Sequence, residues 1–441
     1  MKLISTYSVK LKEYRHIFKD TIRVYRAAVD FFLMVCDQEW EKVSDISTSK
    51  FQMTFIEQLT HKTAKNPATK YDFDAVFYKF PSYLRRAAIY ETLGKYFSYR
   101  SNLANWERDP QGRKPSFPKT GYVYPCLYRD GMYERTDIYT ARIKVYIRNT
   151  WDWIDIKLRK SDVDYIQRHC SHRKECAPTL QKRGKEWFLD FPFEEQVTLN
   201  NTPSKEQVIA AVDLGINSAA TVSVMRADGT VLGRNFCRLP SEKDSLAHAV
   251  NRIKKAQQHG ARKMPRLWAR ANGINDDIAV KTAKFIIDVA VLYNADVIVF
   301  EHLDLKGRKC GSKKQRLHLW KAQRVQSIVT DQAHRLGMRV NHVNAWNTSR
   351  LAFDGSGRIL RGQQSEKTGG SYSVCEFQNG KVYNCDLNAT YNIGARYFIR
   401  TLLKSLPATE RLAVEAKVPS CAKRSTCTLS TLVSLYAVLA A

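Results

Sequence analysis

Three acidic residues stand where a carboxylate could act on a phosphodiester. Asp213 follows the apolar run 208–212, and Glu301 follows the apolar run 297–300. Asp386 opens an apolar stretch with helical spacing. Two buried strands and one helix start would therefore each supply a carboxylate. Hydrolysis of a phosphodiester needs charge stabilisation on the attacking and the leaving oxygen, which two divalent cations held by such carboxylates provide.

The expected ligand set suits magnesium. Mg²⁺ prefers hard oxygen ligands and keeps several waters, so three carboxylates are enough. We expect Asp213 to bridge two Mg²⁺ ions, with Glu301 and Asp386 flanking them. Asn388, two residues beyond Asp386, would add an amide oxygen or orient a bound water. Singly, each acid is more often structural, as a turn residue or a helix cap. Glu301 is the hardest of the three to explain as structural, because burying an unpaired charge is costly. Jointly, at the ends of these elements and in this order, the three acids favour catalysis.

The elements that must position these acids show a mixed α/β pattern. After the strand that ends at Asp213, hairpin strands are expected over 219–225 and 231–236, and a helix from about Ile278. The strand 297–300, a helix over 316–336 and a strand over 338–343 follow. Because hairpin strands precede any crossover, this order predicts a ribonuclease-H-like fold rather than a Rossmann fold.

A basic block lies between the first two acids, over residues 241–270. Charge runs are usually solvated faces, but inside a nuclease core this block is expected to clamp a nucleic-acid backbone. Its members that we assign to nucleic-acid binding are Arg252, Lys254, Lys255, Arg262, Lys263, Arg266 and Arg270.

The sequence predicts helices followed by a β-rich module in the N-terminal part. Apolar residues recur at helical spacing over 11–36, and a second helix over 83–106 mixes Arg85 and Arg86 with tyrosines. That mixture suits phosphate tracking and base stacking, or simply an amphipathic helix with a tyrosine-rich core face. Alternating strands on either side of a turn at 149–152, and a hairpin around Gly184, predict a small barrel. Residues 198–204 read as a linker.

The composition favours a nucleic-acid partner. The 441-residue chain has 71 Lys and Arg against 43 Asp and Glu, a net charge of +28. Such a chain repels itself unless a polyanion neutralises it. Ten cysteines without a Cys-x-x-Cys pair and a start without a signal-peptide pattern indicate a reducing, cytosolic setting. The apolar stretch Leu429–Ala441 is shorter than the roughly 20 residues that span a bilayer, so no membrane role is expected.

Three strings resemble the three RuvC motifs of TnpB, the transposon-encoded RNA-guided DNA nuclease related to miniature type V CRISPR effectors. They are 212–217 (VDLGIN), 297–303 (VIVFEHL) and 386–393 (DLNATYNI). The resemblance implies a guide RNA, a double-stranded DNA target with a short flanking motif, and Mg²⁺-dependent endonucleolytic cutting at one RuvC site. The catalytic acids it implies are Asp213, Glu301 and Asp386. A prokaryotic, cytoplasmic, nucleoid-associated protein is implied as well.

The resemblance also implies a multidomain α+β organisation. A first strand (1–10) and residues 116–200 would build a wedge β-barrel, with a helical recognition domain at 11–115 between them. A ribonuclease-H-like RuvC domain (206–346) would follow, then a target-strand loading insert (347–385), and the RuvC C-terminal part with a tail (386–441).

One departure from the TnpB pattern concerns the insert. TnpB usually carries two Cys-x-x-Cys pairs there, but Ala352, Gly355, Glu376 and Asn379 stand at the aligned positions. Cys375 and Cys385 are poorly spaced for a tetrahedral site, so we expect a degenerate ribbon and no zinc. Arg358 and Arg361 are both candidates for an arginine near the scissile phosphate. Two other functions stay open, namely RNA-guided DNA binding without cleavage, and transposition.

Overall fold

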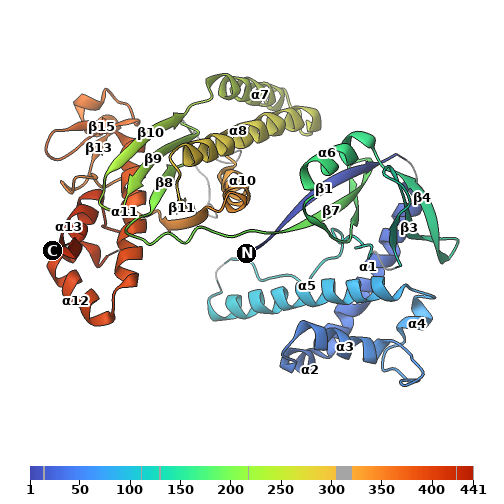
Figure 1. The fold of residues 1–441 in the computed structure, drawn as a ribbon. Coiled ribbons are helices and arrows are strands. Elements are labelled where there is room, and N and C mark those ends of the chain that lie inside the picture. Colours follow the sequence, from blue (N-terminus) through green and yellow to red (C-terminus); the bar gives the residue numbers. More distant parts are fainter. Residues whose placement is uncertain are drawn as a thin grey trace. The chain divides into compact units, whose positions relative to one another are not determined.

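The computed structural model describes residues 1–12, 15–110, 112–128, 131–216, 218–303, 320–423 and 425–440. Contacts divide the chain into one unit of residues 2–196 and another of residues 197–441 with Met1. Both units combine helices with sheets (Figure 1). The predicted mixed α+β multidomain fold is thereby confirmed. Among the described residues, every helix falls short of the length and apolarity that crossing a bilayer requires.

The first unit contains two antiparallel sheets. Strand β1 (Lys2–Leu11) pairs along its whole length with β7 (Glu186–Gln196). Strands β5 (Lys174–Glu175) and β6 (Thr179–Arg183) also pair with β7. The second sheet is the meander of β2 (Tyr133–Arg135), β3 (Thr140–Ile147) and β4 (Thr150–Lys157). A bridge between Leu11 and Leu158 links the two sheets, so the module expected to be a barrel is two joined sheets.

The helices of this unit surround an aromatic core. They are α1 (Arg15–Gln38), α2 (Trp40–Asp45), α3 (Ser49–Thr60), α4 (Phe73–Val76), α5 (Ser82–Arg108) and α6 (Lys160–Cys170). Helix α1 contacts both α5 and β3, because Phe18, Tyr25, Val29 and Phe32 recur at helical spacing and are buried. The sequence pattern did not predict α6. The turn before β4 is shorter than expected, since Arg148 and Asn149, both with positive φ, make it alone.

The second unit is built on a five-stranded sheet in the order β10-β9-β8-β11-β12. Strands β8 (Val208–Asp213), β9 (Ala220–Arg226) and β10 (Val231–Cys237) are antiparallel neighbours. Strands β11 (Val297–His302) and β12 (Arg339–Asn344) run parallel to β8. The strand and hairpin order predicted from the sequence is the order observed.

Helices cover both faces of this sheet. Because strand side chains alternate between faces, Ala210 and Val212 pack toward α8 (Pro265–Leu292) and α10 (Ala322–Arg335). Ile209 and Ala211 pack toward α11 (Cys385–Ser405). Helix α11 lies against the strands, since a Cβ added to Gly394 would stand 2.6 Å from the Met225 sulfur.

The remaining elements form a helical hairpin, an insert and a tail. Helix α7 (Pro240–Gln258) packs against α8. The insert has a three-stranded sheet with short 3₁₀ turns, and the tail is helical and packs on α11. Their bounds are β13 (Leu360–Arg361), η1 (Gly362–Gln364), η2 (Glu366–Thr368), β14 (Val374–Glu376), β15 (Val382–Asn384), α12 (Ala408–Lys417), η3 (Pro419–Cys421) and α13 (Leu429–Ala440).

Two predicted helix starts differ from the structure. Helix α8 begins at Pro265, thirteen residues before the expected Ile278. The polar, glycine-containing segment 272–277 lowers helix propensity, but Ala271 packs against Ala249 and Ile253 of α7, and tertiary packing prevails. The described helix α10 begins at Ala322; residues 316–319 of the expected helix lie outside the described residues.

Candidate active site

Asp213 and Glu301 stand at the same edge of the five-stranded sheet. Strands β8 and β11 are parallel neighbours, and Val212 is the register partner of Phe300. The next residue on each strand is the acid, so the two carboxylates leave the sheet at the same level. Gly215 makes the turn after β8, where a Cβ would lie 2.9 Å from the Ser218 carbonyl oxygen.

Asp386 joins this edge from the first turn of α11. The helix begins after Asn384, whose side chain accepts a hydrogen bond of 2.9 Å from the Leu387 amide. The same helix packs on β8 and β11. Because the cap fixes the start of α11 and Gly394 fixes its distance from the sheet, Asp386 is held beside the strand ends.

The electrostatics tie the three acids together. Burial, followed by the negative charges of Glu301 and Asp386, raises the pKa of Asp213 well above its ordinary value. Burial also raises the pKa of Glu301, against the hydrogen bond from Thr348 and the charge of Arg396. Such repulsion between carboxylates requires that they share one region. Asp213 therefore lies within electrostatic reach of Glu301 and Asp386, and all three acids are half-buried.

Two further side chains act on Asp386. Burial raises the pKa of this acid, whereas a hydrogen bond from Ser218 and the charge of Lys243 lower it. Lys243 stands in the first turn of α7, so the helix that carries the basic block begins close to the acids. Lys243 belongs to the basic block 241–270 predicted from the sequence, but neither Lys243 nor Ser218 was expected at the acidic site.

The donor chemistry of the site suits a hard divalent cation. Carboxylates are the oxygen ligands that Mg²⁺ takes. Burial is the main cause of the raised pKa of Asp213, and a cation would relieve the repulsion from Glu301 and Asp386 that adds to it. Within the described ranges, however, no group of three or more His, Cys, Asp or Glu side chains is arranged to hold a metal ion. The negative charge of Asp213 interacts with those of Glu301 and Asp386, but the described side chains do not form a preformed metal-binding cluster.

Asn388 does not take the role expected from the sequence. This residue is fully buried. Its amide oxygen accepts a hydrogen bond of 2.8 Å from the Phe353 amide, and its amide nitrogen donates one of 2.9 Å to the Leu351 carbonyl. Because these bonds point the side chain at the insert, Asn388 anchors residues 351–353 to α11 rather than supplying a metal ligand.

Two more polar residues on α11 extend this anchoring at four-residue spacing. Asn392 donates hydrogen bonds of 2.9 and 2.8 Å to the carbonyls of Thr348 and Leu351, and Thr348 in turn donates its hydroxyl to Glu301. The buried Arg396 donates to four backbone carbonyl oxygens, those of Asn344, Trp346, Ser425 and Cys427. The sequence contains a signal for these anchoring residues, because they are polar and four positions apart on an otherwise apolar helix. Their role was nevertheless not predicted.

The insert places Arg358 and Arg361 differently. Arg358 is exposed, on a bridge with Leu351. Arg361 is half-buried. A hydrogen bond with Cys385, and to a smaller extent the charge of Arg361, lowers the pKa of the Cys375 thiol. Cys385 immediately precedes Asp386 in the chain, and the charge of Arg361 also acts on the Cys385 thiol. The insert itself packs around a small core of Ala352, Ile359, Cys375, Phe377 and Cys385.

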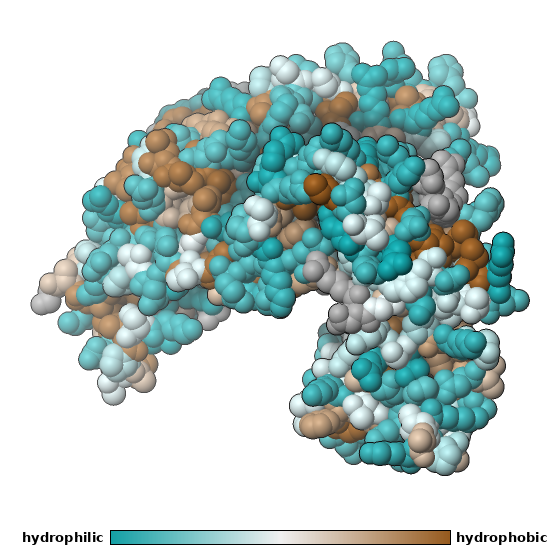
Figure 2. All heavy atoms as spheres, turned by 45° about the vertical axis from the view of Figure 1, so that its right-hand side comes forward, coloured by the Kyte–Doolittle hydropathy of each residue, from teal (hydrophilic) through white to brown (hydrophobic). Residues whose placement is uncertain are grey.

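The residues predicted to bind nucleic acid fall into two groups. All seven selected residues of the basic block are exposed on α7, α8 and the loop between them: Arg252, Lys254, Lys255, Arg262, Lys263, Arg266 and Arg270. Figure 2 shows hydrophilic side chains over much of the visible face. By contrast, Arg85 is buried and donates two hydrogen bonds of 3.2 and 2.8 Å to Glu57. The nucleic-acid assignment of Arg85 is wrong, because packing of α5 on α3 encloses it; the neighbouring Arg86 is half-exposed, 3.5 Å from the same carboxylate.

Comparison with known proteins confirms the predicted resemblance to TnpB. The chain is 27% identical over 234 residues to a TnpB-like protein of Aquifex aeolicus (strain VF5), aq_aa05, an alignment that covers 48% of this chain and 74% of the relative. Residues 5–147 match the model of the Aq_aa04 family.

Solved structures of RNA-guided effectors are also similar. A Cas12f1–sgRNA–target DNA complex aligns at 12% identity and a TM-score of 0.35, covering 89% of this chain and 98% of that one. CasPhi-2 (Cas12j) bound to crRNA and phosphorothioate DNA aligns at 9% identity and a TM-score of 0.43, covering 90% and 91%. Alicyclobacillus acidoterrestris C2c1 with a single-guide RNA aligns at 10% identity and a TM-score of 0.43, covering 86% and 66%.

Proposed function

We propose that this protein is an RNA-guided endonuclease that cuts double-stranded DNA beside a short flanking motif. The observation that carries the proposal is the register of β8 with β11, which brings Asp213 and Glu301 to one sheet edge within the electrostatic reach of Asp386. The strand order of the sheet and its two helical faces support a ribonuclease-H-like RuvC domain. The resemblance to TnpB supports the use of a guide RNA.

Asp213, Glu301 and Asp386 would hold two Mg²⁺ ions, which when bound stabilise charge on the attacking and leaving oxygens. The chain's own contribution is to fix these acids. Thr348 orients Glu301, and Ser218 bonds Asp386. Of the two arginine candidates, we assign the phosphate contact to Arg361, whose charge reaches the Cys375–Cys385 pair next to Asp386. The exposed basic residues of the α7–α8 hairpin would contact the nucleic-acid backbone.

The test is plasmid cleavage by the RNA-loaded protein in Mg²⁺. Asp213→Asn and Glu301→Gln remove one charge each without changing side-chain size, and each should slow cutting by at least about a hundredfold. Both variants should retain bound guide RNA. The matched control is Asp228→Asn, an exposed aspartate in the β9–β10 turn, which should cut at the wild-type rate.

Two results would change the assignment. Cutting by Asp213→Asn at the rate of the control would remove the carboxylate site from the mechanism. A wild-type protein that binds the target duplex with its guide, yet leaves it intact in Mg²⁺, would instead be an RNA-guided binder. Sequencing the RNA that copurifies distinguishes a transposon-derived guide from a processed CRISPR RNA.

A further inference from the structure

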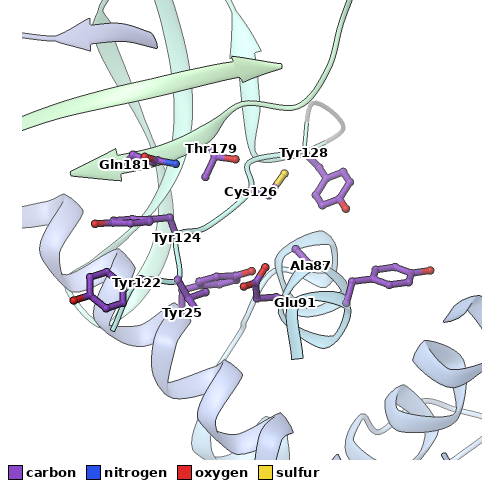
Figure 3. Close-up of a pocket in the computed structure, with 11 residues that line it drawn as sticks. Tyr25, Ala87, Glu91, Tyr122, Tyr124, Cys126, Tyr128, Thr179 and Gln181 are labelled. Carbon is purple, nitrogen blue, oxygen red and sulfur yellow. The ribbon is translucent and has the colours of Figure 1, made fainter. Parts of the chain in front are cut away.

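A tyrosine-lined pocket lies in the first unit between its helices and its β-rich part. The cavity measures about 430 Å³, within the range of small-ligand sites. Helix α1 contributes Tyr25, α5 contributes Tyr90 and Glu91, and β6 contributes Thr179 and Gln181. The segment 122–128, which pairs with the start of β6 through a bridge between Cys126 and Thr179, adds three more tyrosines: Tyr122, Tyr124 and Tyr128. Figure 3 shows the space between the two helices and this segment.

Tyr25 is buried in the core, whereas four of the lining tyrosines are at least partly exposed: Tyr90, Tyr122, Tyr124 and Tyr128. Tyr122 is 90% exposed and Tyr90 38% exposed, an unusual display of large aromatic side chains on one site. Tyr124 is held in place, because Arg26 stacks 5.1 Å from its ring centroid and its hydroxyl donates to the Lys182 carbonyl at 3.2 Å. Rings presented in this way are the surfaces on which nucleobases stack.

Two adjoining hollows continue the pocket on either side. One shares Tyr90 and Glu91 with it, and the other shares Tyr122 and Tyr124. Six basic residues line these hollows, against the acids Asp30 and Glu91: Lys19, Arg23, Arg26, Lys95, Lys119 and Lys182. A base in the central pocket would therefore have cationic side chains on both sides, where the phosphates of the same strand would run.

Glu91 gives the pocket a preference among bases. Its carboxylate faces the Tyr25 hydroxyl (Figure 3), and burial, followed by the negative charge of Glu91, raises the pKa of Tyr25. Lys95 pairs with one carboxylate oxygen at 3.3 Å, but a carboxylate accepts up to four hydrogen bonds and donates none. Guanine presents two adjacent N–H donors on its pairing edge, N1–H and N2–H, which match the two oxygens of a carboxylate. Adenine, cytosine and uracil lack this donor pair.

We propose that this pocket binds an unpaired guanine base, stacked on the tyrosines and recognised through Glu91. The strand that carries the guanine is RNA or DNA, since both present the same base. The pocket belongs to the first unit and the acidic site to the second. The proposal rests on the proposed function only in that the protein must bind nucleic acid.

The test measures the affinity of the full-length protein for short fluorescent oligouridines that contain one central guanosine. Unlabelled oligouridine is added as competitor to suppress purely electrostatic binding, and divalent cations are omitted so that no strand is cut. The guanosine should tighten binding by about tenfold over oligouridine, and inosine, which lacks the N2 amino group, should lose most of that gain. Deoxyguanosine in oligothymidine forms the parallel arm that separates a DNA source from an RNA source.

The variants locate the effect. Glu91→Gln should abolish the guanosine preference while binding to oligouridine is retained, whereas Glu107→Gln, an exposed acid on the same helix, should preserve it. Tyr122→Ala should weaken all oligonucleotides by about tenfold or more, and Tyr122→Phe should not. A wild-type protein that does not distinguish guanosine from inosine, or a Glu91→Gln variant that still does, overturns the proposal. Neither result depends on cutting, so failure of the nuclease assignment is detected separately.

Discussion

Thr348 donates its hydroxyl hydrogen bond to the carboxylate of Glu301, across 47 residues of sequence. Thr348 is itself buried, and its carbonyl accepts a hydrogen bond of 2.9 Å from the Asn392 amide. A carboxylate from one strand is thus oriented by a residue that α11 holds in place. The acidic edge is therefore supported by the helix that also carries Asp386.

Replacing Thr348 tests this support. Thr348→Val keeps the shape but removes the donor to Glu301, and a hydrogen bond to a charged group contributes about 1.5–3 kcal/mol. We expect plasmid cutting to fall about tenfold or more, with a higher Mg²⁺ concentration needed for half-maximal rate. Thr348→Ser keeps the hydroxyl and should restore most of the rate. Equal rates in the valine and serine variants would show that the bond does not orient Glu301 for cutting.

Arg85 is predicted to stabilise the helical part rather than to bind nucleic acid. Arg85→Met leaves Glu57 without its buried partner, and breaking a buried pair costs about 3–5 kcal/mol. The urea midpoint should fall accordingly. The neighbouring Arg86→Met, which removes a half-exposed contact to the same carboxylate, should cost less than about 1 kcal/mol. If both variants unfold at the same urea concentration, the burial of Arg85 does not distinguish the two arginines.

The basic hairpin should determine how binding depends on salt. Replacing Arg262, Lys263 and Arg266 with alanine removes three exposed charges between and at the start of the helices α7 and α8. Each lost phosphate contact lowers the slope of log affinity against log salt by about 0.9 on duplex DNA. Fluorescence anisotropy at several salt concentrations measures that slope. Lys417→Ala, an exposed residue at the end of α12, is the control and should leave the slope unchanged.

Glu39 should make the helical part sensitive to acid. Hydrogen bonds from Lys70 and then Tyr71 hold the pKa of this buried acid at about 2, below its ordinary 4.5. A depressed pKa in the folded state adds stability that is present above the ordinary pKa and lost as the pH falls through the folded value. The urea midpoint should therefore decline below about pH 4.5, and Glu39→Gln should flatten that decline. Glu41→Gln, an exposed neighbour on α2, should behave as wild type.

The sequence alone determined the elements and the acids at their ends. The apolar runs that precede Asp213 and Glu301 are long enough to be strands, and the strings around them are specific enough to reveal the resemblance to TnpB. The two long helices α1 and α5 and the hairpins β3–β4 and β6–β7 were also predictable, because their apolar spacing is local. The exposed charges of the α7–α8 hairpin follow from the same local reasoning.

Only the tertiary structure decided which side chains orient or stabilise these acids and which use their hydrogen-bonding groups for other partners. The sequence allows Arg85 to contact nucleic acid and Asn388 to contact a metal ion. In the structure both are buried: Arg85 donates to the Glu57 carboxylate, and Asn388 donates to the Leu351 carbonyl. Lys243, Thr348 and Arg396 were not assigned to the acidic site from the sequence. In the structure the hydroxyl of Thr348 and the charge of Arg396 act on Glu301, and the charge of Lys243 acts on Asp386. A hydrogen bond or a charge interaction depends on distance in space, and sequence spacing records that distance only within a single element.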